Sequence, residues 1–205
     1  MVKNCSFGKS KIMIKNKIQV VFSVFILLVA VGNAQIEKMQ KKDPLPEFSL
    51  LDDSGDYWDS KVAKGKYLVV YFYPAAMTGG CTKQACAYRD RKEIYQTLNT
   101  SVVGISGDEV ENLSRFKKTY GLNFPLLSDN NGEVSEMFGV TIRKGKKSIK
   151  RHFEGFEVVL NRNVTTARWT FVFSPNGELI YKNDEVKAAQ DAKIVERIIK
   201  QHLKK

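Results

Sequence analysis

The sequence has few of the residues that bind metals or cross-link small folds. Its 205 residues include three cysteines and two histidines, His152 and His202, and both histidines are predicted to lie on the surface. Three cysteines are too few for a disulfide-rich scaffold, and neither the CxxC nor the HxxxH spacing of a conventional zinc site occurs. No cofactor or metal is therefore predicted. Since 43% of the residues are hydrophobic, the chain can form one packed domain with appendages.

Acidic residues are missing from the first 34 positions, which carry five lysines and then the apolar run VVFSVFILLVAV at 20–31. That run is shorter than the roughly 20 residues that span a bilayer. The pattern predicts a secretory signal peptide, 1–34, cleaved after Ala34. We expect an exported protein, periplasmic or extracellular, that does not bind nucleic acid. An uncleaved membrane anchor is the alternative, and translation from Met13 instead of Met1 would give a more ordinary signal length.

The remaining chain reads as a linker, 35–46, and a domain, 47–205. Strands are predicted at 48–51, 67–73, 101–106, 123–127, 170–173 and 179–182, and helices at 82–98, 109–120, 132–138 and 186–203. Within the first helix, Ile94 and Tyr95 are among the residues expected to be buried. This order of elements predicts an α/β fold in which a central mixed β-sheet is flanked by helices.

Two of the three cysteines lie five positions apart in the stretch YFYPAAMTGGCTKQACAYRD at 71–90. A buried strand leads into a loop, 74–80, and Cys81 is expected to open the helix that follows. The free N–H groups and the positive end of a helix dipole stabilise a thiolate there. Thr78 can hydrogen-bond that thiolate or an oxygen reacting with it. The sequence therefore favours redox chemistry at Cys81.

The spacing of Cys81 and Cys86 is unfavourable for a permanent cross-link. In an α-helix, residues five apart have Cα atoms roughly 8–9 Å from each other, whereas disulfides need Cα atoms within about 7 Å. A bond between the two cysteines therefore requires part of the helix to unwind. This geometry argues for a redox switch, although a structural bridge or an inert pair stays open from the residues alone.

The motif PxxxTxxC, formed by Pro74, Thr78 and Cys81, resembles the active-site loop of peroxiredoxins. Its continuation, CTKQACAYRD, is similar to that of the Q-type, or bacterioferritin-comigratory, subgroup. The tetrapeptide RWTF, which begins at Arg168, is similar to the arginine-x-threonine-phenylalanine strand of the same family. The resemblance extends from about residue 42 to residue 203.

The resemblance implies a thioredoxin-like fold and a thiol-dependent peroxidase that acts on hydrogen peroxide and organic hydroperoxides. Cys81 would be the peroxidatic cysteine, and Cys86 the resolving cysteine that forms an intramolecular disulfide with it. Thr78 and Arg168 would polarise the peroxide and stabilise the thiolate, while Pro74 would shield the site. A thioredoxin-like reductant would reopen the disulfide, and the protein would act as a monomer.

The chain departs from the family pattern in three places. Gly79 stands where a proline is usual, and Ala75-Ala76-Met77 replaces a more polar stretch. A basic insertion, RKGKKSIKR at 143–151, lengthens the segment before Arg168. We expect this run to be a solvated loop, with an acidic partner or an anionic surface as a possible contact. Two other functions are considered. A thiol–disulfide oxidoreductase normally uses CxxC, and a copper-binding thioredoxin-like module would recruit His152 beside cysteines spaced CxxxC.

Overall fold

The computed structural model describes residues 39–204. The predicted signal peptide and Cys5 lie outside the described residues. None of the helices between residues 39 and 204 is both long enough and apolar enough to cross a membrane.

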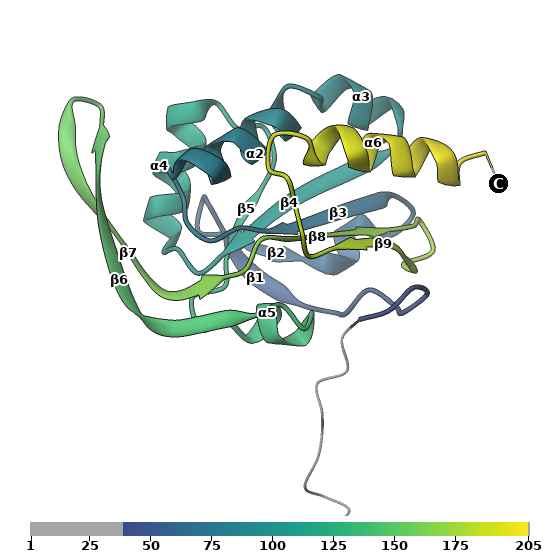
Figure 1. Ribbon diagram of the computed structural model, residues 1–205, viewed down its shortest axis with the longest axis horizontal. Helices are drawn as coiled ribbons and strands as arrows, with labels where there is room; N and C mark the ends of the chain where they lie inside the picture. Colours follow the sequence, from purple (N-terminus) through teal and green to yellow (C-terminus); the bar gives the residue numbers. More distant parts are fainter. Residues whose placement is uncertain (1–38, 205) are drawn as a thin grey trace, which may run out of the picture. The chain divides into compact units, whose positions relative to one another are not determined.

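A seven-stranded mixed sheet forms the centre of the domain, as the sequence predicts (Figure 1). Its order is β2-β1-β5-β4-β3-β8-β9. β3, β4 and β5 are parallel to one another, and the remaining neighbours pair antiparallel. The strands are β1 Ser49–Asp52, β2 Tyr57–Asp59, β3 Tyr67–Phe72, β4 Thr100–Ser106, β5 Leu126–Ser128, β8 Trp169–Phe173 and β9 Leu179–Asn183.

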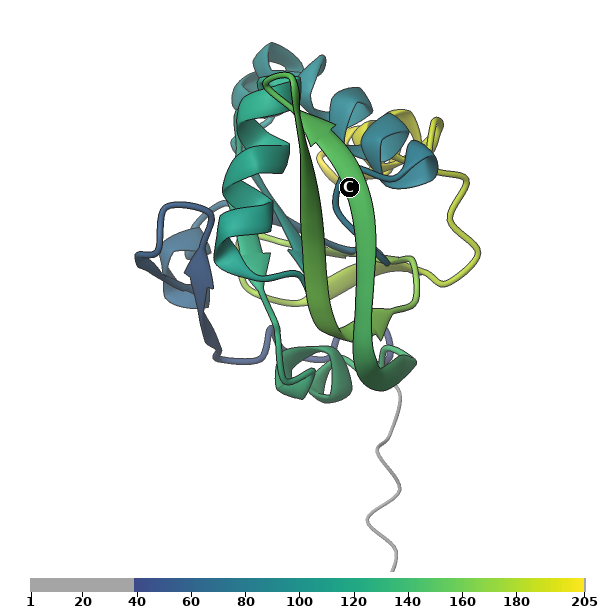
Figure 2. The ribbon, with the colours of Figure 1, turned by 90° about the vertical axis from the view of Figure 1, so that its left-hand side faces the viewer.

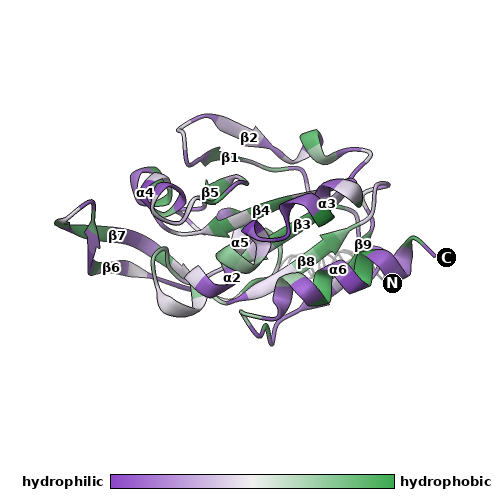
Figure 3. Cartoon of the chain, turned by 90° about the horizontal axis from the view of Figure 1, so that it is seen from above, coloured by the Kyte–Doolittle hydropathy of each residue, from purple (hydrophilic) through white to green (hydrophobic). Residues whose placement is uncertain are grey.

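Helices cover both faces of this sheet, because side chains alternate between the faces along each strand. Tyr67, Val69 and Tyr71 of β3 join one hydrophobic cluster, while Leu68, Val70 and Phe72 join another. The first cluster includes residues of α2 Gly79–Arg89, α3 Lys92–Thr97, α4 Val110–Tyr120 and α6 Asp191–His202. The second receives α5 Glu133–Met137 and the short 3-10 helix η1 Ser60–Ala63. Figure 3 shows apolar (green) and polar (purple) residues alternating along α6, of which Ala192, Val195 and Ile199 are buried.

The helix predicted at 82–98 is two helices. α2 begins three residues earlier, at Gly79, and ends at Arg89, while α3 begins at Lys92. Arg91 lies between them with φ −109° and ψ 14°, outside the helical region. This break changes the face that α3 presents to the core: Tyr95 is buried as expected, whereas Ile94, predicted to be buried, is 37% exposed.

The basic insertion is not a loop but part of a long antiparallel hairpin, β6 Ile142–Phe153 and β7 Phe156–Thr166. Figures 1 and 2 show it running across one end of the sheet toward α4, where Glu154 at its tip forms an ion pair with Lys118. Alternate residues of β7, including Leu160 and Val164, are buried. The loop prediction fails because β6 is exposed along most of its length, and its few half-buried apolar residues, Ile142, Ile149 and Phe153, are too widely spaced to give an alternating pattern.

The described part of the predicted linker lies against the domain. Met39 is buried in the second cluster. The backbone N–H of Lys42 donates to Leu179, at the start of β9, and that of Leu45 donates to Gly177 in the turn before it, at 2.9 and 2.7 Å. These bonds lengthen the ordered part of the domain at its N-terminal side.

Substitution of Phe138, at the end of α5, tests how much the second hydrophobic cluster contributes to stability. Its side chain is fully buried, with ring centroids 5.3 Å from Phe72 and 5.2 Å from Phe171. We expect Phe138→Ala to lower the free energy of unfolding by about 3–5 kcal/mol, because it leaves a cavity among rings that cannot collapse. Urea unfolding measures the change. Tyr57→Ala is the control, since Tyr57 is 79% exposed; an equal loss in both variants would contradict the packing argument.

Candidate active site

α2 carries both cysteines on one continuous helix. Cys81 lies in its first turn and is 2% exposed, while Cys86 is half-buried further along, and both are free thiols. An α-helix keeps their Cα atoms roughly 8–9 Å apart, so the intact helix holds the reduced state, as the spacing predicts. Cys81 is placed two residues inside the helix rather than at its opening.

Arg168 lies directly before β8 and contacts Cys81 from the sheet side. Its Nη2 is 3.2 Å from the Cys81 Sγ. Gly80 leaves room for this approach, because a Cβ at that position would lie 3.2 Å from the same nitrogen, which is closer than most Cβ contacts. The guanidinium favours a negatively charged sulfur, and the first turn of α2 adds its own positive potential. The structure thus brings together two of the residues that the sequence singled out, 87 positions apart.

The loop before α2 carries Pro74, which is half-buried, and Thr78, the N-cap residue. The Thr78 hydroxyl donates to the Ala75 carbonyl oxygen at 2.9 Å rather than to the thiol. Its own carbonyl accepts the first helical bond, from the Thr82 N–H at 2.8 Å. The hydroxyl oxygen keeps acceptor capacity, and rotation of the hydroxyl would turn its hydrogen toward an incoming oxygen.

Two side chains that the sequence analysis missed fix this loop. Asp108, buried after β4, accepts a hydrogen bond from the Ala76 N–H at 2.7 Å. Arg151 of the hairpin donates through Nε to the Met77 carbonyl oxygen at 2.9 Å. Met77 has φ +55°, an unfavourable value for a residue with a side chain. These contacts hold the loop in a strained conformation over Cys81.

Gln84 and Asp191 are two further residues that the sequence analysis missed. The Gln84 Oε1 accepts a hydrogen bond from Arg168 Nη1 at 2.5 Å. Its Nε2 donates to Asp191 Oδ2 at 2.8 Å. Gln84 lies inside the cysteine motif and could have been suspected there, whereas Asp191 follows 107 positions later with no local signal.

Tyr71 and Tyr73 lie in the same hydrophobic cluster as Cys81. Burial raises the pKa of Tyr71 well above its ordinary value, and burial does the same for the pKa of Tyr73. Both rings therefore stay neutral in the hydrophobic cluster that contains Cys81. Arg168 is then the charged group in direct contact with the sulfur, and the site is arranged to hold one negative charge there.

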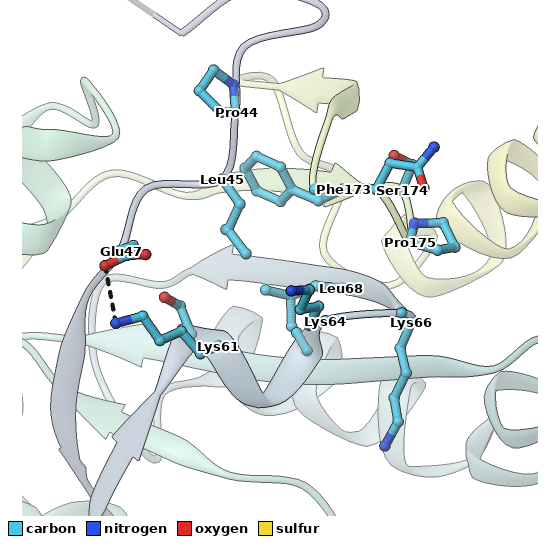
Figure 4. Close-up of a pocket in the computed structure, with 15 residues that line it drawn as sticks. Pro44, Leu45, Glu47, Lys61, Lys64, Lys66, Leu68, Phe173, Ser174 and Pro175 are labelled. Atoms are coloured by element: carbon cyan, nitrogen blue, oxygen red, sulfur yellow. Dashed lines mark ion pairs between the residues drawn. The ribbon is translucent and has the colours of Figure 1, made fainter.

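A cavity of about 760 Å³ lies elsewhere, between the N-terminal segment, η1 and the β8–β9 turn (Figure 4). Pro44, Lys64 and Pro175 are among its lining residues, and Lys61 forms an ion pair with Glu47 across 3.0 Å. None of the residues around Cys81 lines it. The cavity is thus separate from the site around Cys81.

Within residues 39–204, no group of three or more His, Cys, Asp and Glu side chains is arranged to hold a metal ion. His152, which a copper-binding module would recruit, is an exposed residue of β6.

Comparison with known proteins gives consistent matches over most of the domain. The profile of the AhpC/TSA family matches residues 42–182. The peroxiredoxin Bcp of Escherichia coli strain K12 is 36% identical over 161 residues, which cover 78% of this chain and 95% of that protein. A chloroplastic peroxiredoxin Q of Populus jackii is 44% identical over 111 residues, 54% of this chain and 52% of the plant protein.

Solved structures show the same relationship. The peroxidoxin BcpB of Mycobacterium tuberculosis superimposes with a TM-score of 0.66 and 30% identity, over 80% of this chain and 97% of that one. The bacterioferritin comigratory protein of Xanthomonas campestris, a structure described in connection with alkyl peroxide reduction, gives a TM-score of 0.63 and 25% identity. The match covers 78% of this chain and 99% of the Xanthomonas campestris protein.

Proposed function

Because the chain belongs to the AhpC/TSA family, as a Q-type peroxiredoxin with the thioredoxin-like fold, it is a thiol-dependent peroxidase, and we propose that Cys81 is the cysteine that attacks the peroxide. The observation that carries this assignment is the Arg168 guanidinium 3.2 Å from the Cys81 Sγ. The family matches favour this activity over the oxidoreductase and copper-binding alternatives.

In the first step, the Cys81 thiolate attacks one oxygen of the peroxide. The S–O bond forms as the O–O bond breaks, and the departing oxygen takes a proton to leave as water or an alcohol. Cys81 becomes a sulfenic acid, oxidised by two electrons. Arg168 stabilises the negative charge that moves from sulfur to oxygen, and the Thr78 hydroxyl is placed to donate to the peroxide.

In the second step, the Cys86 sulfur attacks the Cys81 sulfenic sulfur. The S–S bond forms as the S–O bond breaks, and water leaves. The first turn of α2 must unwind for this step, since the helix keeps the two Cα atoms too far apart for a disulfide. A thioredoxin-like dithiol then reduces the disulfide by thiol–disulfide exchange and restores both thiols.

Organic hydroperoxides are proposed as substrates beside hydrogen peroxide. The Xanthomonas campestris relative is described in connection with alkyl peroxide reduction. In this chain, the loop before Cys81 is apolar, with Ala75, Ala76 and Met77 all buried. Movement of this loop would therefore offer an alkyl group an apolar rather than a charged surface beside the reacting oxygen.

The proposed cycle is tested by mixing reduced protein with hydrogen peroxide in a stopped-flow instrument. The mass of the oxidised protein is then measured by mass spectrometry. We expect rapid loss of one equivalent of peroxide and a protein mass lower by two hydrogen atoms, from an intramolecular disulfide. Rapid reduction of insulin disulfides with negligible peroxide loss would instead identify the thiol–disulfide oxidoreductase.

Arg151→Ala tests the contribution of the hairpin to this site. Removal of the guanidinium frees the Met77 carbonyl and loosens the loop that carries Thr78. We expect the second-order rate constant for peroxide to fall roughly two- to fivefold, since positioning is weakened while the reacting groups remain. Arg143→Ala, an exposed position of the same strand, serves as the control. Equal rates in both variants would mean that the hairpin does not hold the loop.

Export and a monomeric state are proposed as well. The basic and apolar segments at 1–34 support export with cleavage after Ala34. The position of both cysteines on one helix supports a monomer, because the disulfide can form within one chain. Cell fractionation with N-terminal sequencing tests the first proposal, and light scattering of the purified protein tests the second.

A further inference from the structure

Asp191 is a fully buried carboxyl group at the first residue of α6. Its Oδ2 accepts three hydrogen bonds from two other elements. Gln84 and Tyr88 of α2 donate at 2.8 and 2.7 Å, and Thr170 of β8 donates at 2.8 Å. A buried charge is costly unless it is well hydrogen-bonded, so this convergence marks a position at which a carboxylate is specifically accommodated.

The ionised form fits this arrangement. Burial is the largest effect and leaves the pKa of Asp191 above its ordinary value, while the hydrogen bonds from Tyr88, Gln84 and Thr170 lower that pKa and so favour the carboxylate. Burial also raises the pKa of Tyr88 well above its ordinary value, which keeps the phenol protonated as a donor. Asp191 Oδ1 has no hydrogen-bond partner among the described residues, so the three donors converge on Oδ2 alone.

Asp191 determines how the Gln84 amide is turned. A carboxylate only accepts hydrogen bonds, so the NH₂ group of Gln84 must face it. The amide oxygen then faces the other way and accepts from Arg168 Nη1 at 2.5 Å. The reversed amide would point its NH₂ group at the guanidinium, with donor against donor. The same guanidinium places its Nη2 3.2 Å from the Cys81 sulfur.

We propose that Asp191 is a positioning residue of the peroxidatic site, which acts through Gln84 to hold Arg168 against Cys81. We call this chain of contacts, Asp191 to Gln84 to Arg168 to Cys81, the relay. It begins at a carboxylate, passes through a neutral amide to the positive guanidinium, and ends at the thiolate. The inference rests on the proposed role of Cys81 and extends the site to a carboxylate that does not contact the sulfur. It also gives α2 an anchor on both sides of Cys86, at Gln84 and Tyr88.

Asp191→Asn tests the proposal, with Tyr95→Phe as the matched control. Asp191→Asn removes the negative charge that faces Gln84, whereas Tyr95→Phe removes one buried hydrogen bond to the Ala192 carbonyl oxygen of the same helix and does not lead to Arg168. We expect Asp191→Asn to lower the second-order rate constant for hydrogen peroxide roughly 10- to 100-fold, by analogy with other outer-shell positioning groups. The pH at which iodoacetamide alkylation of Cys81 is half-maximal should rise. Tyr95→Phe should keep both quantities near those of the unmodified protein.

Melting temperatures of both variants separate positioning from stability. A lower melting temperature in both, with the kinetic loss confined to Asp191→Asn, supports the relay. Unchanged peroxide kinetics and alkylation profile in Asp191→Asn overturn it. Should Asp191→Asn not fold, Gln84→Met interrupts the relay at its centre, and full activity in that variant overturns the proposal equally. Peroxide consumption by Cys81→Ser at the rate of the unmodified protein would instead count against the proposed function itself.

Discussion

Cys81→Ser is expected to abolish peroxide reduction, with a loss of at least about 10³-fold in the second-order rate constant. A serine hydroxyl is a weak nucleophile at neutral pH, since hardly any of it is ionised. Within residues 39–204, the side chain hydrogen-bonded to this position is Arg168, which is not a base. Arg168 contacts the reacting atom but can only stabilise a negative charge that is already there. Stopped-flow mixing with hydrogen peroxide measures the loss directly.

The control for Cys81→Ser is the Cys86→Ser variant, which keeps the attacking thiol in the same helix. Circular dichroism should show the same helix content in both variants and in the unmodified protein, because neither sulfur accepts a backbone hydrogen bond that the helix needs. Wild-type peroxide consumption by Cys81→Ser would falsify the assignment of the peroxidatic residue. It would place the attacking sulfur at Cys86 instead.

The predictable part of this protein is the part whose signals are local. The stretch from Pro74 to Cys86 contains the loop, the first turn of the helix and both sulfurs, so one pass over the sequence brings them together. Arg168 was found at long range only because RWTF resembles a known family strand. The central strand at 67–73 was equally clear, since an uninterrupted apolar run predicts burial on both faces. The structure and the family matches confirm the fold class and the family.

The missed features depend on contacts between distant segments. Asp191 is separated from Gln84 by 107 positions, and nothing near it in the sequence distinguishes it from an acidic residue in the first turn of a surface helix. The hairpin escaped notice because β6 exposes cations on both faces, and because Arg162 occupies a buried position of β7. The helix break at Arg91 carries no glycine or proline. Each of these features is set by tertiary packing rather than by local propensity.

Cys86→Ser is expected to separate the two halves of the cycle. The first peroxide should react within about two- to threefold of the normal rate, because Cys81, Arg168 and Gln84 are unchanged. Turnover with a thioredoxin and its reductase should fall by roughly 100-fold or more, since no intramolecular disulfide can form for the dithiol to attack. Coupled oxidation of NADPH measures turnover, and mass spectrometry measures the oxidation state of Cys81.

The same variant tests whether unwinding of α2 protects the Cys81 sulfenic acid from further oxidation. With both cysteines present, unwinding of the first turn exposes Cys81 to Cys86 and competes with further oxidation. Without Cys86 the sulfenic acid stays under the loop, and excess peroxide should convert it to the sulfinic acid. We therefore expect a mass gain of two oxygen atoms at Cys81 in Cys86→Ser and little of it in the unmodified protein. Sustained turnover by Cys86→Ser would show that the reductant attacks the sulfenic acid directly, and α2 would then have no need to unwind.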